Sequence, residues 1–262
     1  MKSWIQITIA VAVLLGLANE RSHAEIIESV TQTTSQARKL ESSSSSGGAN
    51  CNQIVNASSI SGVQYAFKHW VNLCGERSEL VMNKTEIGNT YWYGWSMFIP
   101  SDWQDTSEGY DIVNQWATYP TNKKFSKACG ANGSYIARTK ETFTFNLQRQ
   151  GDVAQIVCQK YPIASVSELR GKWIDFVMHV KWTGNSDGFL RLWTKIGNEP
   201  YNFTINYVGA TYWNDEGTGP YFKMGLYKGD PNFKGPSPRY LYTAQYRLGD
   251  AKSTFQDVAP SR

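Results

Sequence analysis

Apolar and polar positions alternate in short runs along most of the chain. These runs are rich in aromatic and β-branched residues and are separated by Gly, Asn, Asp and Pro, a pattern typical of strands joined by turns. Helical periodicity is scarce, and we expect one short helix at Ile163–Leu169. The spacing favours an all-β sandwich or jelly roll of two antiparallel sheets. The predicted strands are Tyr91–Ile99, Asp111–Thr118, Thr142–Arg149, Trp173–Trp182, Gly188–Ile196, Tyr201–Tyr207, Tyr221–Tyr227 and Tyr240–Leu248.

Residues 1–24 have the pattern of a secretory signal peptide. Lys2 supplies a positive charge, an apolar run follows from Ile7 to Leu17, and small residues stand at the expected cleavage positions before the end of Ala24. The apolar run is too short for a membrane span. We therefore expect a secreted protein, extracellular or periplasmic, that has no membrane partner.

Residues 25–50 are polar and rich in Ser, Thr and Gly, which predicts a flexible linker. The folded domain is then expected at residues 51–262. Its cysteines lie in an exported segment, where disulfides form and persist. We favour the pairs Cys51–Cys74 and Cys129–Cys158, although four cysteines allow three pairings.

Alternation within Tyr221–Tyr227 separates a core face from a second face. The even positions are apolar and predict the core face. The other face carries Tyr221, Lys223 and Tyr227, and Gly225 leaves a gap between them. A strand face with a cation beside two phenols can bind a ligand, and it can equally be an outer face exposed to solvent.

Two further strands carry aromatic rows. Tyr240, Tyr242 and Tyr246 are expected to share one strand face, and Arg191 and Trp193 share a face of another strand. Aromatic surfaces with polar groups between them suit sugar rings. Packing between sheets explains any one row equally well, and only their combination favours a groove.

Composition narrows the class of protein. Aromatic residues make up 14% and charged residues 18% of the 262 residues, so the chain can bury a sizeable core and is not disordered over most of its length. The formal net charge of +4 is too small to suggest a nucleic-acid-binding protein. It suits a local basic site for an acidic ligand.

Five segments in sequence order carry a family resemblance over residues 60–250. They are Arg77-Ser78-Glu79-Leu80, Tyr91-Trp92-Tyr93-Gly94-Trp95-Ser96 with Ile99–Trp103, Asn114-Gln115-Trp116, Trp173–Trp182 and Tyr221-Phe222-Lys223-Met224-Gly225-Leu226-Tyr227. The chain resembles polysaccharide lyases of the glucuronan-lyase and heparin-lyase-I type and is similar to alginate lyases of the same architecture. The resemblance implies a concanavalin-like β-jelly roll whose concave groove binds an anionic polysaccharide and cleaves it by β-elimination.

The resemblance also implies roles for individual residues. Tyr227 matches the catalytic tyrosine, which removes the C5 hydrogen of a uronic acid, and Arg77 and Gln115 match the positions that neutralise the neighbouring carboxylate. A tyrosine has a pKa of about 10, so a base at neutral pH needs a cation nearby, and Lys223 or Arg77 can supply it. The residues assigned to substrate binding are Lys223, Tyr221, Arg191, Trp193, Tyr240 and Tyr242.

One departure from the family pattern concerns histidine. Related lyases often carry a histidine two residues after the glutamine, where this chain has Ala117. His179 lies in an apolar strand and is interpreted as structural, and His69 lies in a segment without an assignment. We therefore expect Tyr227 to act as both base and acid. That is feasible for glucuronate- or mannuronate-type linkages, in which the C5 hydrogen and the O4 bond lie on one face of the ring.

Two other function classes stay open. A secreted, non-catalytic carbohydrate-binding jelly roll would show the same aromatic rows. A laminarinase-type glycoside hydrolase needs paired carboxylates about 5–9 Å apart, and the chain shows no closely spaced acidic cluster of that kind.

We expect no required cofactor and a monomer whose partner is an anionic polysaccharide. The loops at Asn185–Asp187 and Asn214–Glu216 offer oxygen ligands for a structural calcium ion, although turn residues explain both loops as well.

Overall fold

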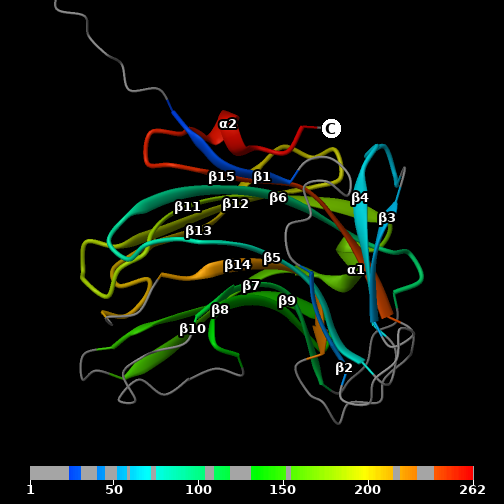
Figure 1. Ribbon diagram of the computed structural model, residues 1–262, viewed down its shortest axis with the longest axis horizontal. Coiled ribbons are helices and arrows are strands. Elements are labelled where there is room, and N and C mark those ends of the chain that lie inside the picture. The colour runs from blue at the N-terminus through cyan, green and yellow to red at the C-terminus, as the bar shows by residue number, and fades with distance from the viewer. Residues whose placement is uncertain are drawn as a thin grey trace, which may run out of the picture.

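Two antiparallel sheets pack face to face in the computed structural model of the protein (Figure 1). The structure describes residues 24–30, 40–44, 52–57, 60–71, 75–103, 109–118, 131–151, 155–214, 219–228 and 239–261. All eight predicted strands are present, with bounds that agree to within one residue. The predicted all-β sandwich is therefore confirmed.

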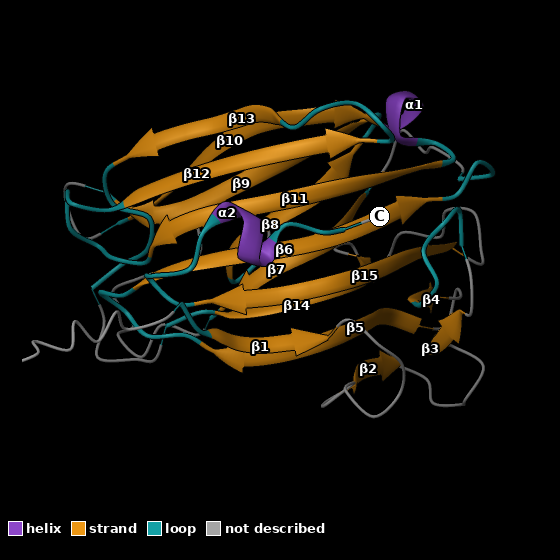
Figure 2. Ribbon diagram, turned by 90° about the horizontal axis from the view of Figure 1, so that it is seen from above, coloured by secondary structure: helices purple, strands orange, loops and turns teal. Residues whose placement is uncertain are grey.

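One sheet has eight strands in the order β13-β12-β11-β6-β15-β4-β3, and β1 pairs with β15 outside that path. Figure 2 views the molecule from this side. The strands are β1 (Ile26–Val30), β3 (Asn52–Ala57), β4 (Ala66–Val71), β6 (Thr90–Ile99), β11 (Lys172–Lys181), β12 (Phe189–Ile196), β13 (Asn202–Val208) and β15 (Arg239–Gly249).

The other sheet has seven strands in the order β10-β9-β8-β7-β14-β5-β2. It arches beneath the first sheet in Figure 1, so its outer side is concave, and we call that side the concave face. β14 lies between β7 and β5. The strands are β2 (Leu40–Ser44), β5 (Gly75–Lys84), β7 (Tyr110–Ala117), β8 (Gly133–Thr139), β9 (Thr142–Gln150), β10 (Ile156–Ser165) and β14 (Tyr221–Lys228).

Aromatic side chains fill the core between the sheets. Trp95 on β6, Trp116 on β7 and Phe222 on β14 are all 0% exposed. Their ring centroids lie 5.0 to 5.5 Å apart in each pairing. Since buried aromatic rings contribute much of the apolar area of a core, these contacts tie β6 of one sheet to β7 and β14 of the other. The predicted core face of β14 is confirmed, because all three of its even-numbered apolar residues are fully buried.

Two short helices complete the fold. α1 (Val166–Leu169) lies within the predicted helical stretch, and it begins at a capping box in which Ser165 and Glu168 each satisfy the backbone N–H of the other. α2 (Phe255–Val258) was not predicted from the sequence. It lies over the outer face of the eight-stranded sheet (Figure 2), where Phe255 contacts Trp193 edge to face.

The prediction of a flexible linker over residues 25–50 is wrong for the segments that form β1 and β2. β1 pairs with β15, and β2 pairs with β5, so the sheets begin well before residue 51. β2 has the sequence LESSS, which shows no apolar alternation. Strand pairing is made by backbone groups that every residue except proline supplies in full. A polar edge strand is therefore hard to recognise from its side-chain pattern.

Several predictions fall on residues outside the described part of the chain. These are residues 1–23 of the signal peptide and the cysteines Cys51, Cys74 and Cys129. Cys158 lies on β10, and the favoured pairings stay predictions. Within the described ranges, no helix is long and apolar enough to cross a membrane.

Candidate active site

β14 places three predicted site residues on the concave face. Because its even-numbered residues point into the core, Tyr221, Lys223 and Tyr227 point the opposite way. Lys223 is only 2% exposed, and the two tyrosines are partly buried. β7 and β5 flank this strand and bring Gln115 and Arg77 to the same face.

Arg77 is the cation that contacts Tyr227. The two residues are register partners on β5 and β14. The guanidinium carbon of Arg77 lies 4.3 Å from the centre of the Tyr227 ring, in a cation–π arrangement. The Arg77 side chain keeps 21% of its surface exposed, so it is within reach of a bound ligand. The guanidinium therefore lies over the face of the phenol ring.

Glu79 joins the two cations of the concave face. Its Oε2 atom lies 3.8 Å from Nη1 of Arg77 and 3.6 Å from Nζ of Lys223, and its side chain is 2% exposed. Two cations around one carboxylate leave an excess of positive charge among these three side chains. From the sequence, Glu79 appeared only within the Arg77-Ser78-Glu79-Leu80 segment and had no role of its own. The alternation in Arg77-Ser78-Glu79-Leu80, which puts Arg77 and Glu79 on one strand face, was the signal that could have identified it.

Gln115 lies beside Lys223 and not beside Tyr227. It is the register partner of Lys223 on one side and of Tyr135 on the other. Its Nε2 atom donates a hydrogen bond of 2.6 Å to the carbonyl oxygen of Asn132. Lys223 is four residues from Tyr227 along β14, which corresponds to roughly 13 Å of strand. Gln115 therefore lies level with Lys223, four residues along β14 from Tyr227.

Cross-strand register arranges the concave face in two rows that run across the strands. One row, taken from β9, β8, β7 and β14, is Asn146, Tyr135, Gln115 and Lys223. The other, taken from β9, β8, β7, β14 and β5, is Thr144, Ala137, Ile112, Tyr227 and Arg77. Such rows present groups from several strands to an extended chain that lies across the sheet. Tyr135 and Asn146 were missed, although the alternation in β8 and β9 places both on this face.

The histidines that the structure describes lie away from the concave face. Ala117, at the position where related lyases carry a histidine, is the register partner of Tyr221. His69 on β4 is fully buried, and burial lowers its pKa to about 4. His179 on β11 stacks on Trp92 at 3.9 Å between ring centroids, and burial, with a smaller effect of a nearby arginine, lowers its pKa to about 4. These contacts agree with the structural role expected for His179.

Four residues predicted to bind substrate lie on the other sheet. Arg191 and Trp193 are on β12, and Tyr240 and Tyr242 are on β15. Their strand neighbours fill the core, so their own side chains face outward from the eight-stranded sheet. The whole sandwich separates them from Tyr227, and a single groove containing all these residues is wrong. Alternation shows which residues share a strand face, but it does not show which sheet the strand joins.

Tyr246 was expected on the same face as Tyr240 and Tyr242, and it is on the opposite one. It is fully buried, and its ring stacks on Phe222 with centroids 5.2 Å apart. The cause is a β-bulge: the register of β15 shifts after Ala244, and Gln245 has a φ of 56°. One extra residue in a strand reverses the face of every residue beyond it.

The loop at Asn185–Asp187 does not fit the calcium site considered from the sequence. The carboxylate of Asp187 lies 2.5 Å from Nζ of Lys181, and Oδ1 of Asn185 accepts a hydrogen bond from Asn214. Asp215 and Glu216 lie outside the described residues. In the described ranges, no three His, Cys, Asp or Glu side chains are grouped as a metal ion requires.

Comparison with known proteins places the chain in a family. The sequence profile of the polysaccharide lyase family matches residues 20–247, which is most of the chain. The protein belongs to the polysaccharide lyase family. This confirms the resemblance seen in the sequence, and it separates this lyase from the glycoside hydrolases that were considered. No curated protein matches the lyase in sequence.

Solved structures of similar fold include three lyases. An endo-β-1,4-glucuronan lyase from the fungus Trichoderma reesei has a TM-score of 0.66 and 18% identity, over 89% of this chain and 98% of that one. An alginate lyase from Aplysia kurodai gives 0.53 and 7%, over 86% and 99%. An alginate lyase from Klebsiella pneumoniae gives 0.52 and 12%, over 77% and 86%. These likenesses confirm the jelly-roll fold of the lyase.

Proposed function

We propose that this lyase is secreted and cleaves a uronic-acid polysaccharide with glucuronate- or mannuronate-type linkages. The observation that supports this most is the contact of Arg77 with Tyr227 on the concave face, next to the cluster of Arg77, Glu79 and Lys223. The two cations there favour a polymer with a carboxylate on each sugar. The glucuronan and alginate lyases of similar fold act, by their names, on polymers of this kind.

Tyr227 carries out both proton transfers in the proposed reaction. Its phenolate takes the C5 proton, the electron pair left behind forms the C4–C5 double bond, and the C4–O4 bond breaks. The phenol then returns the proton to O4, so the tyrosine ends in its starting form. The products are a chain with a free 4-hydroxyl group and a chain that ends in an unsaturated uronate.

One residue can take and return the proton only if both atoms lie on one face of the sugar. This holds for glucuronate and mannuronate, whereas guluronate places them on opposite faces. Ala117 supplies no side chain able to transfer a proton at the position of the family histidine, which agrees with a mechanism that uses the tyrosine alone. The proposal therefore expects cleavage of glucuronan or polymannuronate and little of polyguluronate.

Negative charge develops on the substrate carboxylate as C5 loses its proton. Arg77 is placed to stabilise both this charge and the phenolate, because it contacts Tyr227 and has five N–H donors. Lys223 and the second amide N–H of Gln115, which lie in the neighbouring row, are placed to hold a different carboxylate of the substrate. Loss of one such preorganised donor typically lowers kcat by about 10²–10³-fold.

The test is incubation with glucuronan, polymannuronate, polyguluronate and heparin, with the ultraviolet absorbance of the C4–C5 double bond as the readout. Tyr227→Phe is expected to lower kcat by about 10²–10⁴-fold or more, because the variant cannot transfer a proton. Tyr240→Phe, which removes a phenol oxygen from the opposite face, is the matched control and should keep full activity.

Three outcomes would contradict the proposal. Substantial activity of Tyr227→Phe would exclude the tyrosine as base and acid. New reducing ends without unsaturation would indicate hydrolysis. Binding without cleavage of any of the polymers would favour the non-catalytic carbohydrate-binding protein that the sequence left open.

A further inference from the structure

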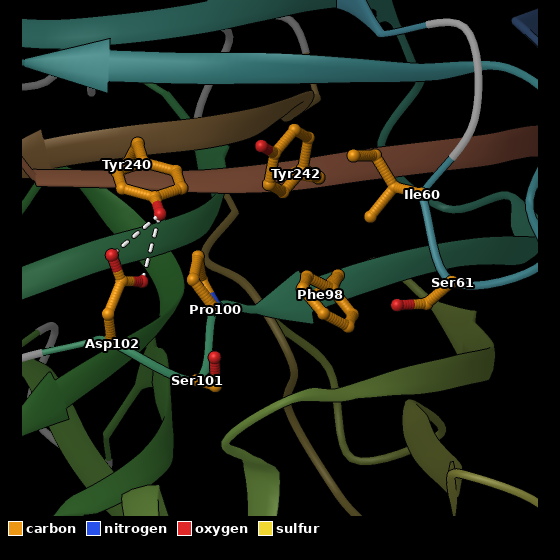
Figure 3. A pocket seen from close by; sticks show the side chains of 8 residues that line it. All are labelled: Ile60, Ser61, Phe98, Pro100, Ser101, Asp102, Tyr240 and Tyr242. Atoms are coloured by element: carbon orange, nitrogen blue, oxygen red, sulfur yellow. Dashed lines mark hydrogen bonds between the residues drawn. The ribbon is translucent and has the colours of Figure 1, made fainter.

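A hollow of about 420 Å³ lies on the outer face of the eight-stranded sheet (Figure 3). Tyr240 and Tyr242 of β15 and Phe98 at the end of β6 form part of its lining. The turn Pro100–Asp102 follows β6, and Ile60 and Ser61 close the other end. Since the core separates the two outer faces, this hollow is distinct from the site at Tyr227.

One end of the hollow is polar. The hydroxyl of Tyr240 donates to both carboxylate oxygens of Asp102, at 2.8 and 2.9 Å. Burial, together with the hydrogen bond and charge of Asp102, raises the pKa of Tyr240 to about 12, so this hydroxyl stays a donor at neutral pH. Asp102 is itself exposed, and an ionised carboxylate offers about four acceptor positions. A carboxylate oriented by one phenol can therefore still accept hydrogen bonds from a ligand.

The rest of the lining combines apolar side chains with the hydroxyl groups of Ser61 and Ser101. The rings of Phe98 and Tyr242 meet edge to face with centroids 5.9 Å apart, and Pro100 and Ile60 lie beside them. Phe98 also packs against Trp173 at 5.4 Å, which holds its ring in place. Sugar rings have apolar C–H faces that pack on such surfaces, while a few fixed polar groups orient their hydroxyls.

We propose that this hollow is a second carbohydrate site, which binds a neutral sugar residue and not a uronate. Charge decides between the two. Among the lining residues that the structure describes, Asp102 is the one with a formal charge, and it would repel a ligand carboxylate. Neighbouring hydroxyls of a neutral sugar can instead donate to it in charge-assisted hydrogen bonds. Lys68 lies against the Tyr240 ring, with Nζ 4.2 Å from its centroid, but does not line the hollow.

The two outer faces of the sandwich thus bind sugars of different charge. Arg77 and Lys223 favour an acidic chain on the concave face, and Asp102 favours a neutral chain on the opposite face. A lyase built in this way can hold a neutral polysaccharide while it cleaves an acidic one that lies in the same material. The second site goes beyond the proposed function and does not depend on it.

The test is isothermal titration with cellohexaose, mannohexaose and xylohexaose, and with an oligoglucuronate as the anionic counterpart. At least one neutral hexasaccharide is expected to bind at millimolar concentrations. Asp102→Ala should weaken that binding about tenfold or more, since hydrogen bonds to a charged group are lost. Tyr227→Phe is the matched control on the opposite face and should bind the neutral oligosaccharide as the natural protein does.

The site is overturned if no neutral hexasaccharide binds, if Asp102→Ala binds as tightly as the natural protein, or if Asp102→Ala loses binding of the oligoglucuronate. Circular dichroism of Asp102→Ala shows whether the variant is folded, and Tyr242→Ala provides a second variant that removes an apolar wall. Cleavage of a soluble polyuronate by Asp102→Ala should be unchanged. Binding of neutral oligosaccharides by Asp102→Ala therefore tests the second site, whereas cleavage of polyuronates by Tyr227→Phe tests the lyase mechanism.

Discussion

Gly225 lies where β14 comes closest to β5. Its φ is 148°, and a Cβ atom there would lie 2.2 Å from the carbonyl oxygen of Ser78 and 2.6 Å from Nδ1 of His69. The backbone of β5 and a buried imidazole therefore leave no room for a side chain at this position. Only glycine accepts both the backbone conformation and the close contact.

Gly225→Ala tests this close approach. Backbone strain alone should lower the free energy of unfolding by about 1–3 kcal/mol, and crowding against Ser78 should add to the loss. Gly62→Ala is the matched control, because Gly62 has a φ of 87° and a Cβ atom there would meet nothing within 4 Å, so it isolates the strain. Urea unfolding measures both variants. Equal losses would show that the approach of β14 to β5 is not what requires glycine.

β14 arranges the candidate active site as two neighbouring groups. Tyr227 faces Arg77 across one strand pair, and Lys223 faces Gln115 across the other. The long side chains of the two cations converge on the same oxygen of Glu79, although their positions on β14 and β5 differ. From the sequence, Arg77 and Gln115 were expected to neutralise the same carboxylate. The structure places Arg77 beside Tyr227 and Gln115 beside Lys223, so we expect the two residues to contact different carboxylates.

The two groups should respond differently to substitution. Arg77→Ala is expected to lower kcat by about 10²–10³-fold, because charge on the reacting sugar and on the phenol loses its counterion. Gln115→Ala is expected mainly to raise KM, because Gln115 is placed to hold a carboxylate of the polysaccharide other than the one on the reacting sugar. Steady-state kinetics on glucuronan or polymannuronate, with thermal unfolding to confirm folding, measures the split. A large loss of kcat in Gln115→Ala with an unchanged KM would instead place the amide at the reacting sugar.

His69 connects the two sheets of the sandwich. It extends from β4, and its Nδ1 and Nε2 atoms each lie 2.8 Å from a partner: the carbonyl oxygen of Ser78 on β5 and Oγ1 of Thr243 on β15. The ring is fully buried, and burial lowers its pKa from 6.5 to about 4. The folded protein therefore holds the imidazole neutral at pH values where the unfolded chain would protonate it.

Stability should fall on acidification through this histidine. Because the folded pKa lies below the unfolded one, the contribution is fully present above pH 6.5 and is lost as the pH falls toward 4, by up to roughly 3 kcal/mol. His69→Gln should lower stability at pH 7 but lose less between pH 6.5 and 4. His179→Gln is the comparison, because burial also lowers the pKa of His179 to about 4 and its removal should likewise reduce the acid-induced loss. Parallel curves for His69→Gln and the natural protein would refute the assignment.

Local patterns revealed most of the fold and part of the site. Alternation located eight strands and the core face of β14, because the side chains of a strand point to alternate faces whatever surrounds it. The segments around Arg77 and Tyr227 indicated the family, because their residue types and their order along the chain resemble those of related lyases. Strands β1 to β5, β8 and β10 were not among the predicted strands. β2 was missed because backbone pairing at a sheet edge places no demand on the side-chain pattern.

The sequence by itself determined the all-β class and the lyase family, and it identified the strand that bears the candidate tyrosine, Tyr227. Only the tertiary structure decided that Arg77 and not Lys223 contacts Tyr227, that the bulge at Gln245 turns Tyr246 inward, and that Tyr240 lies on the opposite face. The physical reason is the separation along the sequence of the residues that interact. Periodicity is a property of neighbouring residues, whereas sheet membership and register depend on contacts such as that of His69 with Thr243, 174 residues apart.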